Sequence, residues 1–143
     1  MDPVFRLQFR VPAEVVDANR HVNNVAYVQW MQDAAIAHAE VCGGARLAQE
    51  QGGSWFVRMH RIEYLKPAFL NDELTVLTWV ADWRKVRSLR RYRFIRSSDQ
   101  TVLAEGETEW VFVDAATGRP RIIPERIVGV FGVATEASVG CRV

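Results

Sequence analysis

The sequence contains few of the residues that mark metal-binding or disulfide-stabilised proteins. Its two cysteines, Cys42 and Cys141, lie far apart and form no CxxC pattern. Free thiols are therefore expected, with a disulfide between them as the alternative. The three histidines form no HxxxH or HExxH arrangement, and none lies near a pair of cysteines. These absences predict that the protein has no transition-metal site.

Long apolar runs and a strong charge of either sign are also missing. No apolar stretch approaches the roughly 18–20 residues that span a bilayer, so no membrane segment is expected. The chain begins Met1-Asp2-Pro3 and lacks a basic stretch followed by a long apolar one, which predicts no secretory signal and a cytoplasmic location. A net charge of +1 argues against bulk attraction to nucleic acid. We expect a soluble protein with neither nucleic acid nor membrane as a partner.

The composition is that of one globular domain. The chain has 143 residues, of which 49% are hydrophobic and 24% are charged. A chain of this length can bury about 68–70% of its unfolded surface. No internal repeat or low-complexity tract is visible, so we expect a single domain over residues 1–143.

Hydrophobic periodicity predicts one long, buried helix. From about Asn24 to Cys42, apolar residues recur at intervals of three and four and cover most of the helix surface. Asn23 or Asn24 can cap the start of this helix, and Gly43-Gly44 can end it. This helix is therefore expected to lie in the core.

The rest of the sequence is rich in strand patterns. Alternating or branched and aromatic residues predict strands over residues 4–11, 55–65, 73–83, 86–96 and 101–114. Pro124 suits the first position of a short terminal helix. The order of elements implies an α+β domain in which an antiparallel sheet wraps on a single helix.

The stretch just before the predicted helix contains the most informative polar pattern. Asp17, Asn19 and His21 alternate, so on an extended backbone they share one side. A carboxylate, an amide and an imidazole beside a helix N-terminus provide what hydrolysis of a carbonyl compound requires. The backbone N–H of Asn24 or Val25 is placed to polarise the carbonyl. The competing interpretations are a capping Asp17, a turn at Asn19 and a structural His21.

Basic residues crowd one short segment: Arg84, Lys85, Arg87, Arg90, Arg91, Arg93 and Arg96. The simplest interpretation is a solvated strand face whose charge also discourages edge-to-edge pairing. Arginine also binds phosphate oxygens bidentately, so a site for a phosphorylated ligand is the alternative. Nucleic acid is disfavoured because the segment lacks interleaved aromatics and a glycine-rich signature.

Three parts of the sequence resemble one family: the stretch from Asp17 to Tyr27 with its HVNN motif, YLKP at 64–67 and DEL at 72–74. They are similar to the hotdog-fold thioesterases, in particular the 4-hydroxybenzoyl-CoA thioesterase-like acyl-CoA thioesterases and the thioesterases that act on acyl carrier protein (acyl-ACP). The likeness covers nearly the whole chain in element order. It implies a hotdog fold, with an antiparallel sheet of roughly five strands around one long central helix.

The resemblance also implies roles for the motif residues. Asp17 would be the general base that activates water, or would itself attack the thioester carbonyl, and we favour the base. Asn19 would position the substrate or the carboxylate, and His21 would orient water or stabilise charge. Asn24 would supply the polarising N–H, and Tyr27 would pack in the core or line the acyl tunnel.

For the CoA end of the substrate, the resemblance implies contacts to the nucleotide phosphates from four residues: Arg87, Ser88, Arg90 and Arg91. CoA would then be part of the substrate, and no separate cofactor is expected. The resemblance further implies a homodimer or a pair of dimers with active sites between subunits. Pairing the open sheet edges across a two-fold axis gives a physical reason for this assembly.

Three functions remain open at this point. The first is an acyl-CoA thioesterase, which releases the free acid and CoA. The second is a related enzyme whose acyl group is carried by acyl carrier protein. The third is a non-catalytic acyl-binding or scaffolding protein that kept the fold.

Overall fold

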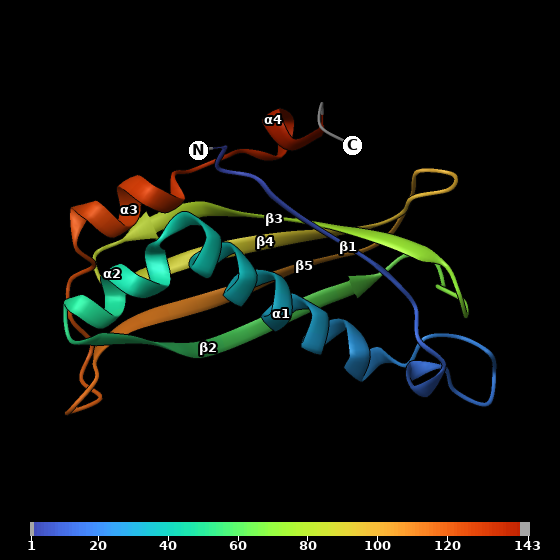
Figure 1. Ribbon diagram of the computed structural model, residues 1–143, viewed down its shortest axis with the longest axis horizontal. Coiled ribbons are helices and arrows are strands. Elements are labelled where there is room, and N and C mark those ends of the chain that lie inside the picture. The colour runs from blue at the N-terminus through green and yellow to red at the C-terminus, as the bar shows by residue number, and fades with distance from the viewer. Residues whose placement is uncertain (1, 141–143) are drawn as a thin grey trace.

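A single sheet with a long helix across one face forms the part of the chain, residues 2–140, that the computed structural model describes (Figure 1). The sheet order is β1-β3-β4-β5-β2, and every neighbouring pair is antiparallel. The strands are β1 (Phe5–Arg10), β2 (Gly53–Tyr64), β3 (Glu73–Arg84), β4 (Arg87–Arg96) and β5 (Thr101–Asp114). The long helix is α1 (Asn24–Cys42). The predicted α+β class, with an antiparallel five-stranded sheet and one long helix, is confirmed.

Both ends of α1 are fixed by the residues that flank it. Asn23 Oδ1 accepts a hydrogen bond from Ala26 N at 2.9 Å, and Asn23 Nδ2 donates to Val15 O at 2.9 Å. Asn23 therefore caps the helix and ties it to the preceding loop. At the other end, Gly43 has a φ of 87°, a left-handed conformation that glycine adopts without strain. The predicted bounds of α1 are confirmed.

Shorter helical segments supplement α1 in the described chain: a 3₁₀ turn (Ala13–Val15), α2 (Gly44–Glu50), α3 (Glu125–Phe131) and α4 (Glu136–Gly140). The sequence predicted that Gly43-Gly44 ends the long helix and predicted no further helix before the strand that begins at residue 55. Gly44 instead begins α2 and packs closely, since a Cβ there would come within 2.3 Å of the Phe131 ring. The prediction that Pro124 is the first residue of this helix is wrong, because Pro124 is the N-cap and α3 begins at Glu125.

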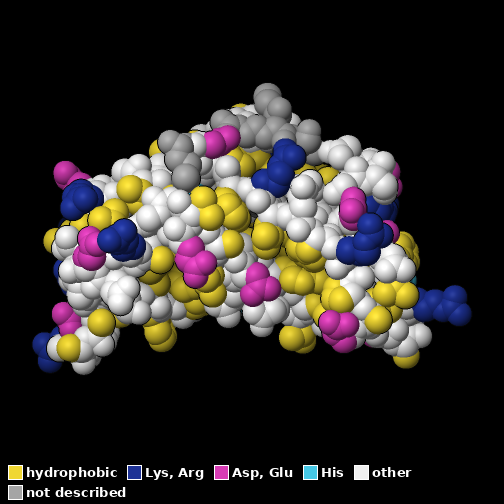
Figure 2. All heavy atoms as spheres, in the orientation of Figure 1, with side chains coloured by type: hydrophobic (Ala, Val, Ile, Leu, Met, Phe, Trp, Pro, Cys, Tyr) yellow, Lys and Arg dark blue, Asp and Glu magenta, His cyan; other side chains and the backbone are white. Residues whose placement is uncertain are grey.

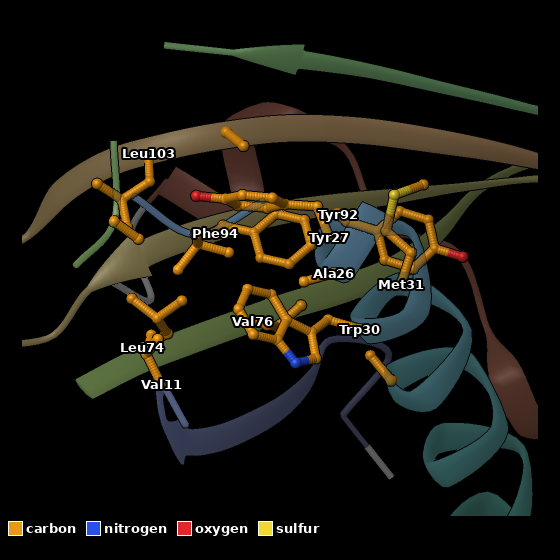
Figure 3. Close-up of a cluster of buried hydrophobic side chains, with 14 of the residues drawn as sticks. Val11, Ala26, Tyr27, Trp30, Met31, Leu74, Val76, Tyr92, Phe94 and Leu103 are labelled. Atoms are coloured by element: carbon orange, nitrogen blue, oxygen red, sulfur yellow. The ribbon is translucent and has the colours of Figure 1, made fainter. Parts of the chain in front are cut away.

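The core beneath the first half of α1 is aromatic. Tyr27 and Trp30 on α1 lie against Phe94 on β4, and the Tyr27 and Phe94 ring centroids are 5.2 Å apart at 73° (Figure 3). Burying each such side chain contributes roughly 1.5–3 kcal/mol to folding. The helix approaches the sheet closely at Gly106 on β5, where a Cβ would lie 3.1 Å from Met31 Sδ. This packing fixes the start of α1 on the sheet.

The two edges of the sheet differ in length. β1 has 6 residues, whereas β2 has 12, and β2 pairs only with β5 within the described chain. Large hydrophobic side chains remain exposed nearby: Phe56 on β2 is 61% exposed, and Val25 and Ile36 on α1 are 77% and 51% exposed. Figure 2 shows hydrophobic side chains spread over the face on which α1 lies, with acidic groups scattered among them. Among residues 2–140, no helix combines the length and the apolar character needed to cross a bilayer.

Candidate functional site

The segment before α1 folds into a tight turn, which corrects the extended backbone expected from the alternation of polar residues. Val16 and Val22 form an isolated antiparallel bridge, and Asp17 N donates to His21 O at 2.8 Å. Asp17 Oδ1 accepts from the backbone N–H of Asn19 at 2.9 Å and of His21 at 3.2 Å. A short acidic side chain that binds nearby backbone N–H groups in this way favours a turn over a strand. The turn brings Asp17 and His21 together by reversing the chain.

Most of the polar residues predicted at the site border one small cavity at the start of α1. Its volume is about 270 Å³, and it is lined by Asp17, His21, Val22, Asn24, Tyr27, Tyr64, Leu65, Lys66 and Pro67. Asn19 does not line this cavity, and its backbone N–H supports the Asp17 carboxylate from within the turn. The structure therefore groups Asp17, His21, Asn24 and Tyr27 and separates Asn19 from them.

The Asp17 carboxylate is oriented through one oxygen and open at the other. Oδ1 accepts both backbone hydrogen bonds, while Oδ2 accepts none from any residue in the range 2–140. Since the carboxylate borders the cavity, Oδ2 is available to a water molecule or a substrate. A carboxylate held in this way can accept a proton or attack an electrophile.

The first residue of α1, Asn24, also lines this cavity. The cap formed by Asn23 satisfies Ala26 N, whereas the N–H groups of Asn24 and Val25 donate to none of the described residues. Asn24 lines the cavity, and its carbonyl oxygen accepts from Tyr64 Oη at 3.0 Å. Free N–H groups at a helix start carry partial positive charge and can bind a developing oxyanion.

The aromatic residues at this cavity have structural contacts of their own. Tyr27 is only 3% exposed, and burial, followed by the influence of Tyr64 and Asp72, raises the pKa of Tyr27 to about 12. A phenol with this pKa stays protonated near neutral pH, which suits a wall of the cavity better than a proton carrier. The His21 ring contacts the Phe69 ring edge to face, with centroids 5.4 Å apart.

A second, larger cavity lies towards the other end of α1. Its volume is about 520 Å³, and its walls come from α1, α2, β2, β3, β4, β5 and α3. Aromatic side chains contribute much of the lining: Trp55, Trp83, Trp110 and Phe131. The two cavities share no lining residue within the described chain.

Arg90 is the buried cation of the larger cavity. It is 4% exposed, and its Nη1 contacts His38 Nδ1 at 2.9 Å and donates to Thr78 Oγ1 at 3.1 Å. Burial lowers the pKa of Arg90, although a guanidinium remains charged at neutral pH. Burial, and secondly the Arg90 charge, lowers the pKa of His38 to about 3. His38 is therefore neutral, and its Nδ1 accepts from Arg90.

The four residues predicted to contact nucleotide phosphates lie on opposite faces of β4. Ser88 and Arg90 face inward and line the larger cavity, whereas Arg87 and Arg91 face outward. Strand alternation makes this separation unavoidable, since residues 87 and 91 share one parity and residues 88 and 90 the other. These four side chains therefore do not converge on one site within a single chain.

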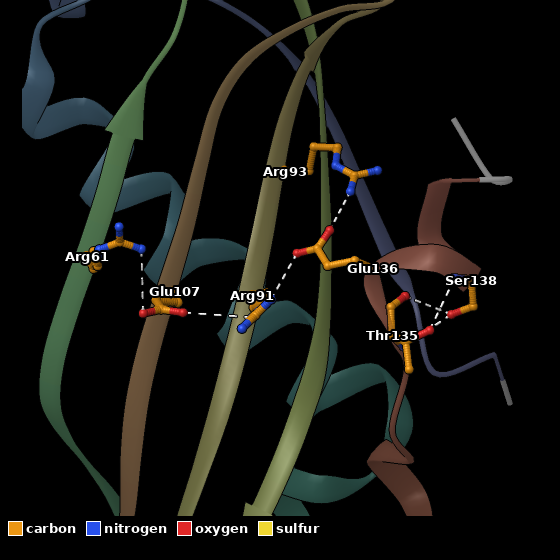
Figure 4. A network of polar contacts seen from close by, with 7 residues as sticks. All are labelled: Arg61, Arg91, Arg93, Glu107, Thr135, Glu136 and Ser138. Carbon is orange, nitrogen blue, oxygen red and sulfur yellow. Dashed lines mark hydrogen bonds and ion pairs between the residues drawn. The ribbon is translucent and has the colours of Figure 1, made fainter.

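Carboxylates neutralise the outward-facing arginines. Arg91 lies between Glu107 and Glu136, at 3.8 Å and 3.3 Å, and Glu136 also pairs with Arg93 at 2.5 Å (Figure 4). Arg87 contacts Glu109 at 3.0 Å. The expectation that these charges protect a sheet edge is wrong, because β4 is the central strand of the five. The buried Arg90 also departs from the expected solvated face.

Sequence reasoning did not identify Tyr64 and Lys66 as site residues. They line the smaller cavity from the end of β2 and the loop that follows it. Their sequence YLKP was part of the family likeness, which was the available signal. The His38–Arg90 pair was missed as well, although Arg90 shares its strand face with Tyr92 and Phe94, an apolar pattern that places it inside.

The cysteines and potential metal ligands add no further chemistry to the described residues. Cys42 is a free thiol, and Cys141 lies outside the described residues. No group of three or more His, Cys, Asp or Glu side chains within residues 2–140 is arranged to hold a metal ion.

Comparison with known proteins gives consistent similarities. The sequence profile of the Thioesterase-like superfamily matches residues 11–131. The acyl-CoA thioester hydrolase YbgC of Escherichia coli O157:H7 is 30% identical over 131 residues, which cover 90% of this chain and 96% of YbgC.

Solved structures share the fold at lower sequence identity. YbaW, a probable thioesterase from Escherichia coli, has a TM-score of 0.81 and 19% identity over 87% of this chain and 94% of that one. Slr0204, a 1,4-dihydroxy-2-naphthoyl-CoA thioesterase from Synechocystis, has a TM-score of 0.80 and 15% identity over 90% and 95%.

Proposed function

Because this chain belongs to the thioesterase-like superfamily and is a thioester hydrolase, we propose that it hydrolyses acyl-CoA thioesters at the cavity bordered by Asp17 and Asn24. The observation that carries this proposal is the shared position of an oriented carboxylate and unused helix N–H groups. A base and an oxyanion site are the two groups that hydrolysis of a thioester needs. The CoA belongs to the substrate, and the reaction uses no other cofactor.

In this mechanism Asp17 acts as the general base. Its Oδ2 takes a proton from a water molecule as the water oxygen bonds to the thioester carbonyl carbon. The N–H of Asn24 or Val25 stabilises the oxygen that becomes negative in the tetrahedral intermediate. The intermediate collapses by breaking the carbon–sulfur bond, and the CoA thiolate then leaves and takes up a proton. Attack by the carboxylate itself is the alternative that the same geometry permits.

The remaining site residues orient these groups. Asn19 holds the Asp17 carboxylate through its backbone N–H. His21 lies beside it at the cavity and orients the water, and Tyr27 closes the apolar side. Tyr64 fixes the first turn of α1 through the Asn24 carbonyl. Lys66 places a positive charge at the cavity for the phosphates of CoA.

We further propose that the protein acts as a homodimer through the long free edge of β2. A two-fold axis pairs this strand with its own copy in antiparallel fashion, so opposite ends of the two strands meet. Tyr64, at one end of β2, borders the smaller cavity, and Gly53, at the other end, borders the larger one. In each chain, the turn that carries Asp17 and His21 would then lie next to the partner's larger cavity, and that cavity would receive the acyl group.

The test is release of free thiol from short-chain, long-chain and aromatic acyl-CoAs, with native protein compared with Asp17→Asn. Asparagine keeps an oxygen for the two backbone N–H groups but cannot accept the proton, so kcat should fall about 10²–10⁴-fold. Sedimentation equilibrium should give about twice the chain mass of 16.3 kDa. Full activity in Asp17→Asn would refute the assignment of the base. Native protein that hydrolyses acyl-ACP but no acyl-CoA would move the substrate to the carrier protein.

A further inference from the structure

Arg90 is a buried cation that contacts neutral groups and forms no direct ion pair with a carboxylate in the described chain, although the charge of Asp2 acts on its neighbour His38. It is 4% exposed and takes part in none of the ion pairs among residues 2–140. The outward-facing Arg91, next to it on β4, differs because it contacts two carboxylates, Glu107 and Glu136. Burying a cation without a counter-charge is costly, and a bound anion would offset that cost.

The groups that do contact Arg90 are neutral. His38 and Thr78 both bind the same nitrogen, Nη1, and the Phe131 ring centroid lies 5.5 Å from the guanidinium carbon. Nη2 and Nε donate to none of the residues in the range 2–140, while Arg90 itself lines the larger cavity. The two hydrogen-bonding contacts of Nη1 therefore fix the guanidinium, and its Nη2 and Nε remain available to donate to an acceptor in the cavity.

The cavity around this cation suits an apolar body with one negative end. Most of its roughly 520 Å³ is bounded by aromatic and aliphatic side chains, among them Trp55, Trp83 and Val80. Ser88, one inward position from Arg90 on β4, adds a hydroxyl beside the cation. Glu40, an acid on the cavity lining, is exposed and forms no ion pair with Arg90 in the described chain. The volume lies within the range of small-molecule sites.

We propose that this cavity binds a carboxylate attached to an apolar or aromatic body, with Arg90 as the residue that anchors the anion. One guanidinium matches the single charge of a carboxylate, whereas a phosphate carries more negative charge and Arg90 is the one cationic side chain among the described residues of the cavity lining. This inference rests on the proposed function in one respect. In the proposed dimer, the group bound by Arg90 is the far end of the acyl chain. The preferred substrates are therefore acyl-CoAs whose acyl group carries a free carboxylate at the end away from the thioester.

Binding of three ligands with the same body, measured by calorimetry on the native protein, tests the site without catalysis. The probes are 6-phenylhexanoate, its neutral amide and 6-phenylhexyl phosphate. A charge-assisted hydrogen bond to the guanidinium predicts roughly tenfold to hundredfold tighter binding of the acid than of the amide. Equal binding of acid and amide, or no binding of either, overturns the proposal. A phosphate that binds more tightly than the acid overturns the choice of a carboxylate.

Two variants on the same strand locate the effect. Arg90→Met removes the charge and keeps a long apolar side chain, so the preference for the acid over the amide should disappear. Arg91→Met changes the neighbouring outward-facing arginine and should retain that preference. Arg90→Lys keeps the charge and should retain part of it. An acid preference that survives in Arg90→Met overturns the assignment of the anchor.

Turnover separates this inference from the proposed function. Native protein should show a higher kcat/KM for a six-carbon acyl-CoA that ends in a carboxylate than for hexanoyl-CoA, and Arg90→Met should narrow that ratio. Hydrolysis of both substrates with equal kcat/KM overturns the proposed preference for a carboxylate-bearing acyl group and still supports the proposed thioesterase activity. Tight binding of the acid with no hydrolysis of any thioester keeps the site and refutes the proposed function.

Discussion

The neutral state of buried His38 makes the stability of the fold depend on pH. His38 is 1% exposed, and protonating it would place a second positive charge beside Arg90. Its pKa in the folded protein is about 3, against 6.5 for an unperturbed histidine. The unfolded chain therefore binds a proton more readily than the folded one between these two values. Stability from this group is complete above pH 6.5 and falls as the pH decreases towards 3.

The size of this effect follows from the two pKa values. Each pH unit between them changes the free energy of unfolding by about 1.4 kcal/mol. Lowering the pH from 7.5 to 5 should cost about 2 kcal/mol, and lowering it to 4 should cost about 3 kcal/mol, through His38 alone. A small domain is typically stable by about 5–15 kcal/mol, so a loss of this size is readily measured.

Urea unfolding at pH 7.5, 6, 5 and 4 measures this loss, with His38→Gln as the comparison. The glutamine oxygen can accept the Arg90 hydrogen bond but does not titrate, so the difference between the two proteins isolates the histidine. The native protein should lose about 3 kcal/mol more than His38→Gln between pH 7.5 and pH 4. Parallel pH profiles for the two proteins would show that His38 accepts a proton without cost, and would refute the burial of a neutral imidazole against Arg90.

Two other substitutions test the packing that fixes the site. Asn23→Ala removes the cap on Ala26 N, and thermal unfolding should show a loss of about 1–2 kcal/mol. Gly53→Ala places a Cβ 2.2 Å from the Phe112 ring, so chemical denaturation should show a loss of about 1–3 kcal/mol. Gly129→Ala, in α3 with nothing within 4 Å of the new Cβ, is its control and should be neutral or stabilising by up to about 1 kcal/mol. A cost at Gly129 equal to that at Gly53 would contradict this account of the packing.

Local chemistry made the elements of the fold predictable. Period-three-and-four apolar residues, the Asn23 cap and Gly43 together define α1, and each acts within a few residues. α2 was not predicted because it has only seven residues and directly follows the end of α1, and its position depends on contact between Gly44 and Phe131, which are far apart in the chain. Tertiary packing of this kind leaves no periodic signal in a single sequence.

The candidate site was predictable in its residues but only partly in its geometry. Alternation placed Asp17, Asn19 and His21 on one side of a strand, yet the Asp17 side chain binds the backbone and forms a turn instead. The basic segment misled for a related reason. The number of arginines in the segment did not indicate that Arg90 is buried. The buried position follows from strand alternation, since Arg90 lies on the same face of β4 as the apolar Phe94.

The inward-facing row of β4 changes character along its length, from Ser88 and Arg90 at one end to Tyr92 and Phe94 at the other. One end of α1 therefore rests on tightly packed rings, while the other end borders a hollow. Substitutions in the hollow can alter which molecules fit there, while the packed end holds the turn that carries Asp17 in place. A change of bound molecule and a change of fold stability would thus involve different halves of the same helix.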